Sequence, residues 1–105
     1  MIELSVMYPE QKDKRFNLDY YLNDHVRLVQ RTWGKLIKDA YITKGVSSVA
    51  EGAPPLYRVT AHLRFGSLED LGEALAQGAE IFADIPNFTD IQPVVQANEV
   101  LAGNG

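Results

Sequence analysis

Residues 16–34 read FNLDYYLNDHVRLVQRTWG, and this stretch predicts the amphipathic helix around which the rest of the chain is organised. Asn17 is suited to cap the first free amides of the helix, and Phe16 to pack against Tyr21 in the following turn. Gly34 predicts the end of the helix, in the left-handed conformation that glycine adopts without steric penalty. Apolar side chains recur at three- and four-residue spacing and predict one buried face: Leu18, Tyr21, Leu22, Leu28, Val29 and Trp33.

His25 lies on the same predicted face, among aliphatic and tyrosyl side chains. Tyr21 precedes it by four residues, a spacing that brings two side chains together on a helix. The histidine is either a core residue bonded to a carbonyl or a tyrosine hydroxyl, or a proton-transferring or ligand-binding group at the edge of a cavity. The spacing alone leaves both interpretations open and favours the core interpretation.

The composition limits the classes of protein to which the chain can belong. Its 105 residues fit one domain, residues 1–105, and 46% hydrophobic residues are enough to fill a core. The net charge is −4 and no basic run exceeds KDKR at residues 12–15, so we expect no nucleic-acid partner. The absence of cysteine excludes disulfides and cysteine-bound metals. No signal peptide or membrane-spanning segment is visible, so we expect a cytoplasmic protein without a membrane partner.

The remaining hydrophobic patterns predict strands and a second helix. Four stretches are typical of strands: residues 1–8, 35–48, 56–65 and 91–101. The pattern of the second stretch is the weakest, and Pro93 must lie at an edge or a bulge of the last strand because it lacks an N–H group. Ser67 predicts the start of the second helix, which should end before Pro86. The apolar residues of this helix keep the helical period: Leu68, Leu71, Leu75, Ala79 and Phe82.

The order strand–helix–strand–strand–helix–strand predicts an α+β fold. It is typical of a ferredoxin-like βαββαβ sandwich, in which a four-stranded antiparallel sheet carries two helices on one face. The other face of the sheet would carry Met7 and His62 among polar groups such as Ser5 and Thr60. Because this face resembles neither a dry core nor a charged surface, it modestly favours a homodimer in which His62 faces the partner subunit.

The sequence resembles the EthD-like family of the dimeric α+β barrel superfamily over nearly its whole length. The matching motifs are Tyr8-Pro9, Phe16-x3-Tyr20-Tyr21-x3-His25, His62-Leu63-x-Phe65-x-Ser67-Leu68-Glu69 and IPNFTDIQP at residues 85–93. Two positions depart from the family pattern. Arg27 stands where proline is frequent, which leaves the first helix free to run without a kink, and Phe88 stands where tyrosine is common.

This resemblance implies a homodimer whose two sheets face each other, with a pocket in each subunit between sheet and helices. Related proteins bind apolar or aromatic small organic molecules there, some as cofactor-free enzymes and others with haem. His25 would act as general base or hydrogen-bond donor, with Tyr21 as its orienting partner. The expected ligand-binding walls are Tyr8, Phe16, Trp33, Phe82 and Phe88. Core packing alone is a competing explanation for each of these aromatic residues.

Three functions stay open. The first is binding of a small apolar or aromatic organic molecule, in a role auxiliary to the oxidative degradation of organic compounds. The second is a cofactor-independent monooxygenase or isomerase with His25 as general base, and the third is a structural or stress-related dimer without a dedicated ligand. We expect no metal, because His25 and His62 fall on opposite faces of the sheet, and no cofactor, because the chain has no glycine-rich phosphate loop.

Overall fold

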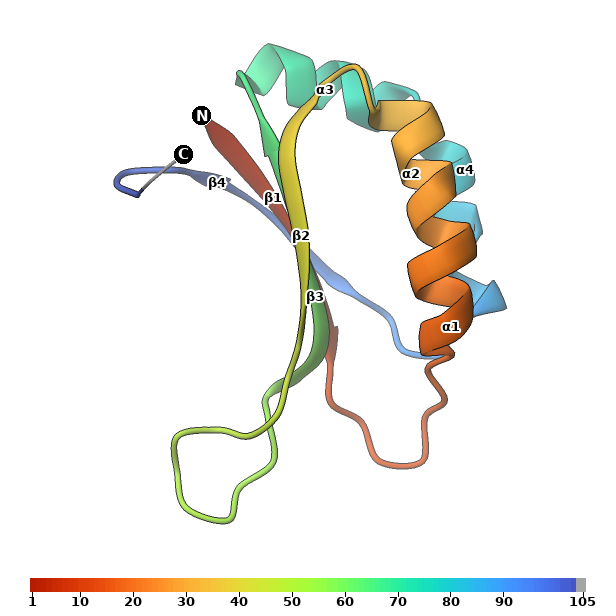
Figure 1. Cartoon of the computed structure of the whole chain (residues 1–105), viewed down its shortest axis with the longest axis vertical. Coiled ribbons are helices and arrows are strands. Elements are labelled where there is room, and N and C mark those ends of the chain that lie inside the picture. The colour runs from red at the N-terminus through yellow and green to blue at the C-terminus, as the bar shows by residue number, and fades with distance from the viewer. Residues whose placement is uncertain (104–105) are drawn as a thin grey trace.

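The computed structural model describes residues 1–103 and places the helices on one face of a four-stranded sheet (Figure 1). The strands are β1 (Ile2–Pro9), β2 (Ile37–Lys44), β3 (Tyr57–Phe65) and β4 (Val94–Glu99). The sheet order is β2-β3-β1-β4, and each neighbouring pair is antiparallel. This arrangement confirms the predicted α+β class and its ferredoxin-like βαββαβ order.

Buried and less buried side chains alternate along the two central strands, β1 and β3, and the buried ones mark the face of the sheet that the helices cover. Leu4 of β1 lies opposite Leu63 of β3, and Val6 lies opposite Ala61, so their buried side chains form one continuous layer beneath the helices. The pattern of β2 was the weakest in the sequence because β2 is an edge strand, and all of its residues after Ile37 are exposed.

The first helical rod consists of α1 (Leu18–Tyr20), a π-helical turn η1 (Tyr21–His25) and α2 (Val26–Trp33). Its start is confirmed, because the Asn17 side chain accepts a hydrogen bond from the Tyr20 amide at 3.1 Å. The Phe16 ring also packs against Tyr21, with 5.2 Å between ring centroids.

Two details of this rod differ from the sequence expectations. A π-helical turn, which has more residues per turn than an α-helix, ends at His25, although Arg27 in place of proline predicted a helix without a kink. The Asn23 side-chain amide donates to the Asp19 carbonyl at 2.7 Å. A side chain bonded in this way competes with the backbone N–H that would otherwise bond to the same carbonyl, which disturbs the regular α-helical hydrogen bonds. Gly34 has φ −55°, so the predicted left-handed end is wrong and the chain leaves α2 in a right-handed turn.

The second predicted helix is divided into α3 (Leu68–Ala76) and α4 (Ala79–Ala83), followed by a short 3₁₀ turn, η2 (Ile85–Asn87). Its start is confirmed, because Ser67 accepts a hydrogen bond from the Asp70 amide at 3.1 Å. The break falls at Gly78, which is packed against Trp33 without room for a side chain.

The break changes which side chains of this segment are buried. In Figure 1, α3 crosses one end of the sheet, whereas α4 turns to run beside α2. Leu71, Ala74 and Ile81 therefore fill the core, whereas Leu68 of the predicted apolar face stays 66% exposed. A straight helical period could not predict this change of direction.

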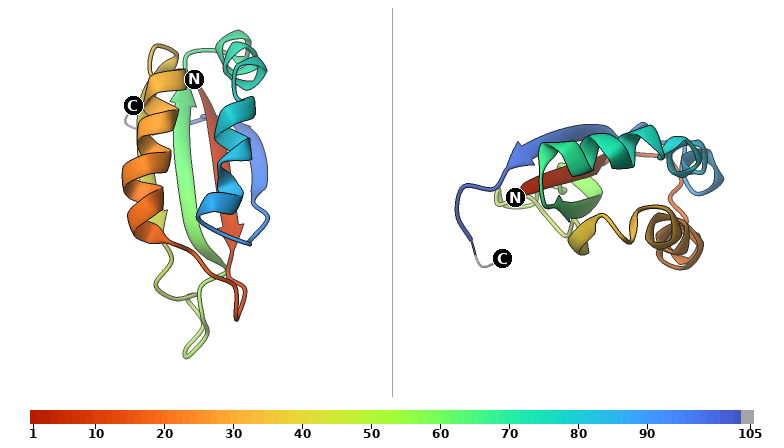
Figure 2. Two further views of the ribbon diagram at one scale, coloured as in Figure 1. Left: turned by 90° about the vertical axis from the view of Figure 1, so that its right-hand side faces the viewer. Right: turned by 90° about the horizontal axis from the view of Figure 1, so that it is seen from above.

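The last strand is shorter than predicted and begins after Pro93, which cannot donate to the sheet. Figure 2 shows the result: α1 and α2 lie on one side and α4 on the other, both over the same face of the sheet. No helix within residues 1–103 is long and apolar enough to cross a membrane.

Candidate functional site

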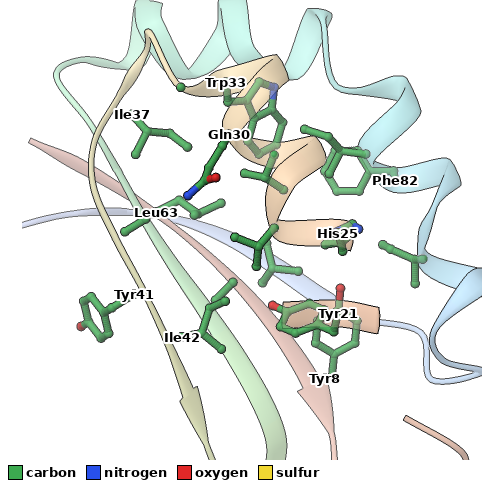
Figure 3. A pocket seen from close by; sticks show the side chains of 18 residues that line it. Tyr8, Tyr21, His25, Gln30, Trp33, Ile37, Tyr41, Ile42, Leu63 and Phe82 are labelled. Atoms are coloured by element: carbon green, nitrogen blue, oxygen red, sulfur yellow. The ribbon is translucent and has the colours of Figure 1, made fainter. Parts of the chain in front are cut away.

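A cavity of about 330 Å³ lies between the helices and the sheet. Its walls come from β1, η1, α2, β2, β3, α4 and the start of η2, so residues far apart in the sequence enclose it only after folding. Most of the lining is apolar, as with Trp33, Ile37, Ile42, Leu63 and Phe82 (Figure 3). This volume is at the lower end of the range of about 300–1,000 Å³ typical of small-molecule pockets.

The polar side chains of the cavity are separated along its length. Tyr8, Tyr21 and His25 lie at one end, and Gln30 extends its amide into the cavity farther along α2 (Figure 3). None of the described residues that line the cavity is Asp, Glu, Lys or Arg. The cavity can therefore form hydrogen bonds at both ends without presenting a permanent charge.

His25 is paired with a carboxylate that the sequence did not indicate. Its Nδ1 lies 2.9 Å from Oδ2 of Asp84, and the two side chains are only 7% and 12% exposed. An ionised carboxylate only accepts hydrogen bonds, so in the neutral form of the ring Nδ1 carries the proton and Nε2 keeps its lone pair. This arrangement orients the ring and leaves Nε2 as the basic nitrogen.

Asp84 itself is fixed by further donors. The Tyr20 hydroxyl donates to Oδ1 at 2.7 Å, and the Asn87 amide donates to the same oxygen at 2.9 Å. Burial raises the pKa of Asp84, but hydrogen bonds from Asn87, Tyr20 and His25 outweigh burial and hold it below the ordinary value. The Asp84 carboxylate is therefore ionised at neutral pH and can stabilise a positive charge on His25.

Aromatic rings support the polar end from behind. Phe88 is fully buried, and its ring centroid lies 4.7 Å from that of His25 and 5.0 Å from that of Tyr21. Phe16 packs against Tyr8 at 5.2 Å. Burial raises the pKa of Tyr8 and the pKa of Tyr21, so both hydroxyls stay protonated in the physiological range.

The structure brings together most of the residues singled out in the sequence. Those that line the cavity are Tyr8, Tyr21, His25, Trp33 and Phe82. Phe16 and Phe88, which we expected in the walls, instead lie in the aromatic cluster behind Tyr8 and Tyr21. They pack against other rings because they lie on the two segments that meet at the Phe16–Thr89 bridge.

Asp84 is the functional candidate that the sequence analysis missed. It directly precedes the IPNFTDIQP motif but is separated from His25 by 59 residues, and only the packing of α4 beside α2 joins the two. Within the sequence, the one available signal was an acidic residue at the end of an amphipathic helix.

His62 lies on the opposite face of the sheet, as predicted. Its ring stacks on Tyr41 with centroids 4.4 Å apart, and its Nε2 lies 3.3 Å from the Thr43 hydroxyl. Its Nδ1 is buried without a hydrogen-bond partner, 3.6 Å from a carboxylate oxygen of Glu3. The described residues contain no group of three or more His, Asp or Glu side chains that could hold a metal ion.

The sheet order and helix placement define a two-layer protein of the ferredoxin-like class. The sequence matches no protein-family model and no curated protein. Among solved structures, it is similar to an EthD-like protein from Ralstonia eutropha JMP134, with TM-score 0.90 and 36% identity over 98% of this chain and 94% of that one. The chain therefore belongs to the EthD-like family.

Two further structures share the fold. An ethyl tert-butyl ether D (EthD) family protein from Bacillus halodurans C-125 gives a TM-score of 0.76 at 18% identity, covering 96% of this chain and 99% of that one. A protein from Arabidopsis thaliana gives 0.66 at 14% identity, covering 98% and 97%. The identity in both cases is too low to carry more than the architecture.

Proposed function

We propose that this protein binds a small, largely apolar organic molecule in the cavity between its sheet and helices. The observation that carries this proposal is an apolar cavity with hydrogen-bonding groups grouped at the end where His25 meets Asp84. Apolar walls supply affinity through burial, and a few fixed polar groups orient the ligand. A role auxiliary to the oxidative degradation of organic compounds, which the resemblance to the EthD-like family implies, is part of this proposal.

The His25–Asp84 pair favours a second candidate function, proton transfer without a cofactor. Nε2 of His25 would take a proton from an acidic C–H or O–H group of the ligand and return it to another atom, as in an isomerase. The ionised Asp84, hydrogen-bonded to Nδ1, would stabilise the imidazolium formed in between. Removing this carboxylate should slow such a reaction and still leave the apolar ligand bound.

Ligand binding can be tested with naphthalene and a variant that fills the cavity. Ala61 is a buried cavity-lining residue of β3, so Ala61→Leu places three additional carbons in the ligand's space. The matched control is Ala50→Leu, on the exposed loop between β2 and β3. In NMR titrations we expect naphthalene to shift cavity resonances in the parent and in the control but not in Ala61→Leu. Binding that is unchanged in Ala61→Leu would contradict the proposed location.

We also propose a homodimer formed through the face of the sheet that the helices leave uncovered. This face carries the half-buried Met7, the stacked Tyr41–His62 pair and the exposed Val94. A second copy would bury these groups and could offer a partner to the His62 Nδ1.

Sedimentation equilibrium tests the dimer. We expect a dimer at micromolar concentration, and dissociation in Met7→Lys, which places a charge in the centre of this face. The control Leu68→Lys, at an exposed position of α3, should stay dimeric. A parent protein that sediments as a monomer would rule the dimer out without affecting the cavity.

A further inference from the structure

The cavity has hydrogen-bonding groups at two ends, and together they specify the ligand more closely than its apolar walls do. This inference rests on the proposed ligand binding described above. At the inner end, the hydroxyls of Tyr8 and Tyr21 accompany the imidazole of His25. Within residues 1–103, neither hydroxyl forms a hydrogen bond to the protein, and burial is the main cause of the raised pKa of each. These groups are therefore available to a ligand.

The His25 end of the cavity offers a hydrogen-bond acceptor and hydrogen-bond donors side by side. Asp84 occupies the Nδ1 side of the imidazole, so Nε2 on the ring edge away from Asp84 accepts a hydrogen bond. The hydroxyls of Tyr8 and Tyr21 stay protonated and supply donors next to it. An acidic hydroxyl such as that of a phenol or an enol matches this set, because its proton meets Nε2 while its oxygen accepts from a tyrosine.

The second polar group is Gln30, whose amide points into the cavity (Figure 3). It follows His25 by five residues on the same helix, which corresponds to about 7.5 Å along the helix axis. That span is comparable to the distance between substituents at opposite ends of a two-ring aromatic molecule. An amide both donates and accepts, so it suits an uncharged hydroxyl or carbonyl.

Charge complementarity limits the ligand further. Since the described lining contains no Lys, Arg, Asp or Glu, a carboxylate or ammonium group at the Gln30 end would find no counterion in the cavity wall, although this end is open to solvent. We propose that the natural ligand is an uncharged ring compound with two polar ends: a phenolic or enolic hydroxyl toward His25 and a neutral hydrogen-bonding group toward Gln30.

A series of four probes with one carbon skeleton tests this proposal: naphthalene, 2-naphthol, 2,6-dihydroxynaphthalene and 6-hydroxy-2-naphthoate. We expect each hydroxyl to tighten binding about three- to tenfold, the range for one net hydrogen bond. The carboxylate probe should bind more weakly than 2,6-dihydroxynaphthalene, because the lining offers no counterion to its charge. Dissociation constants come from NMR titration or calorimetry on the intact protein.

Two variants, each with a matched control, show which end of the cavity causes the increase in affinity from each hydroxyl group. Tyr21→Phe should reduce the gain from the first hydroxyl, and Gln30→Leu should remove the gain from the second. The controls are Tyr57→Phe and Gln92→Leu, which change exposed side chains outside the lining and should keep both gains. The absorption of 2-naphthol gives an independent readout, because a proton shared with His25 moves its spectrum toward that of naphtholate.

The outcomes separate the two proposals. If naphthalene binds as tightly as both hydroxylated probes, or if the carboxylate probe binds best, the two-ended ligand is wrong although the cavity still binds organic molecules. If no probe binds up to its solubility limit, the proposed function fails and this inference fails with it. If the second hydroxyl still increases affinity in Gln30→Leu as it does in the parent, Gln30 does not bind the ligand and is removed from the proposal.

Discussion

Replacing Gly78 with alanine tests how tightly the break between α3 and α4 is packed. A Cβ atom at this position would lie 2.7 Å from Cζ2 of Trp33 and 3.2 Å from the Ala74 carbonyl oxygen. Trp33 cannot move away freely, because it is buried and its indole N–H donates to that same carbonyl at 2.7 Å. The backbone of Gly78, with φ −93° and ψ 4°, is accessible to alanine, so the steric cost in the folded state comes from this contact and not from the backbone conformation.

The expected magnitude is the difference between two opposing terms. Forcing an additional methyl group into a well-packed core costs about 1–3 kcal/mol. Replacing glycine by alanine also restricts the unfolded chain, which contributes about 0.4–1 kcal/mol to stability. We therefore expect Gly78→Ala to lower the free energy of unfolding by about 1–2 kcal/mol, a large fraction of the about 5–15 kcal/mol that holds a typical domain folded.

Gly72 provides the matched control within the same segment. It lies inside α3, and a Cβ atom there would meet no atom within 4 Å. Gly72→Ala should therefore raise the free energy of unfolding by about 0.5–1 kcal/mol. Urea titrations followed by circular dichroism compare the two variants. Circular dichroism can also be used for variants of Trp33, whereas tryptophan fluorescence cannot, because Trp33 is the only tryptophan in the chain.

A double-mutant cycle identifies the cause of the loss. Trp33→Phe removes the ring atom that Gly78→Ala would strike, at the cost of the hydrogen bond to Ala74. The double variant should then be more stable than the sum of the two single effects by about 0.5–3 kcal/mol. If Gly78→Ala is as stable as the parent, or if the two changes are additive, the proposed contact is wrong.

Three further predictions concern the site and its supports. Asp84→Asn should make the free energy of unfolding less dependent on pH in the acid range. Because the pKa of Asp84 is lowered from 3.8 on folding, its contribution is complete above that pH and is lost as the pH falls through the folded value. Ser67→Ala should cost about 1 kcal/mol, since the Asp70 amide loses its acceptor, whereas Ser47→Ala should be neutral. Phe88→Ala should cost about 3–5 kcal/mol and broaden the His25 imidazole resonances, because Phe88 supports that ring. Denaturant titrations check all three changes, and a Phe88→Ala variant with sharp, unshifted His25 signals would contradict the last.

The features that the sequence predicted correctly are those set by neighbours in the chain. Asn17 and Ser67 cap their helices through bonds to amides three residues away, so a short motif contains all the necessary information. Alternation in β1 likewise follows from the pleat of a single strand and correctly indicated Leu4 and Val6 as core residues.

The features that were missed depend on contacts between distant segments. Asp84 has no local pattern that sets it apart from other acidic residues, and its role depends on meeting His25 across two helices. The break at Gly78 depends on close packing against Trp33, which lies 45 residues earlier in the chain. The π turn that ends at His25 was also missed, because residue types alone do not show that the Asn23 side chain donates to the Asp19 carbonyl.

The break at Gly78 and the candidate site are consequences of one packing event. Because α4 turns to run beside α2, Phe82 reaches the cavity wall, and Asp84, two residues later, reaches the Nδ1 of His25. A helix that continued straight from α3 would carry Asp84 past the end of the sheet and leave His25 without its carboxylate. Gly78→Ala should therefore change the His25 imidazole resonances as well as stability, whereas Gly72→Ala should change neither the cavity nor the pair.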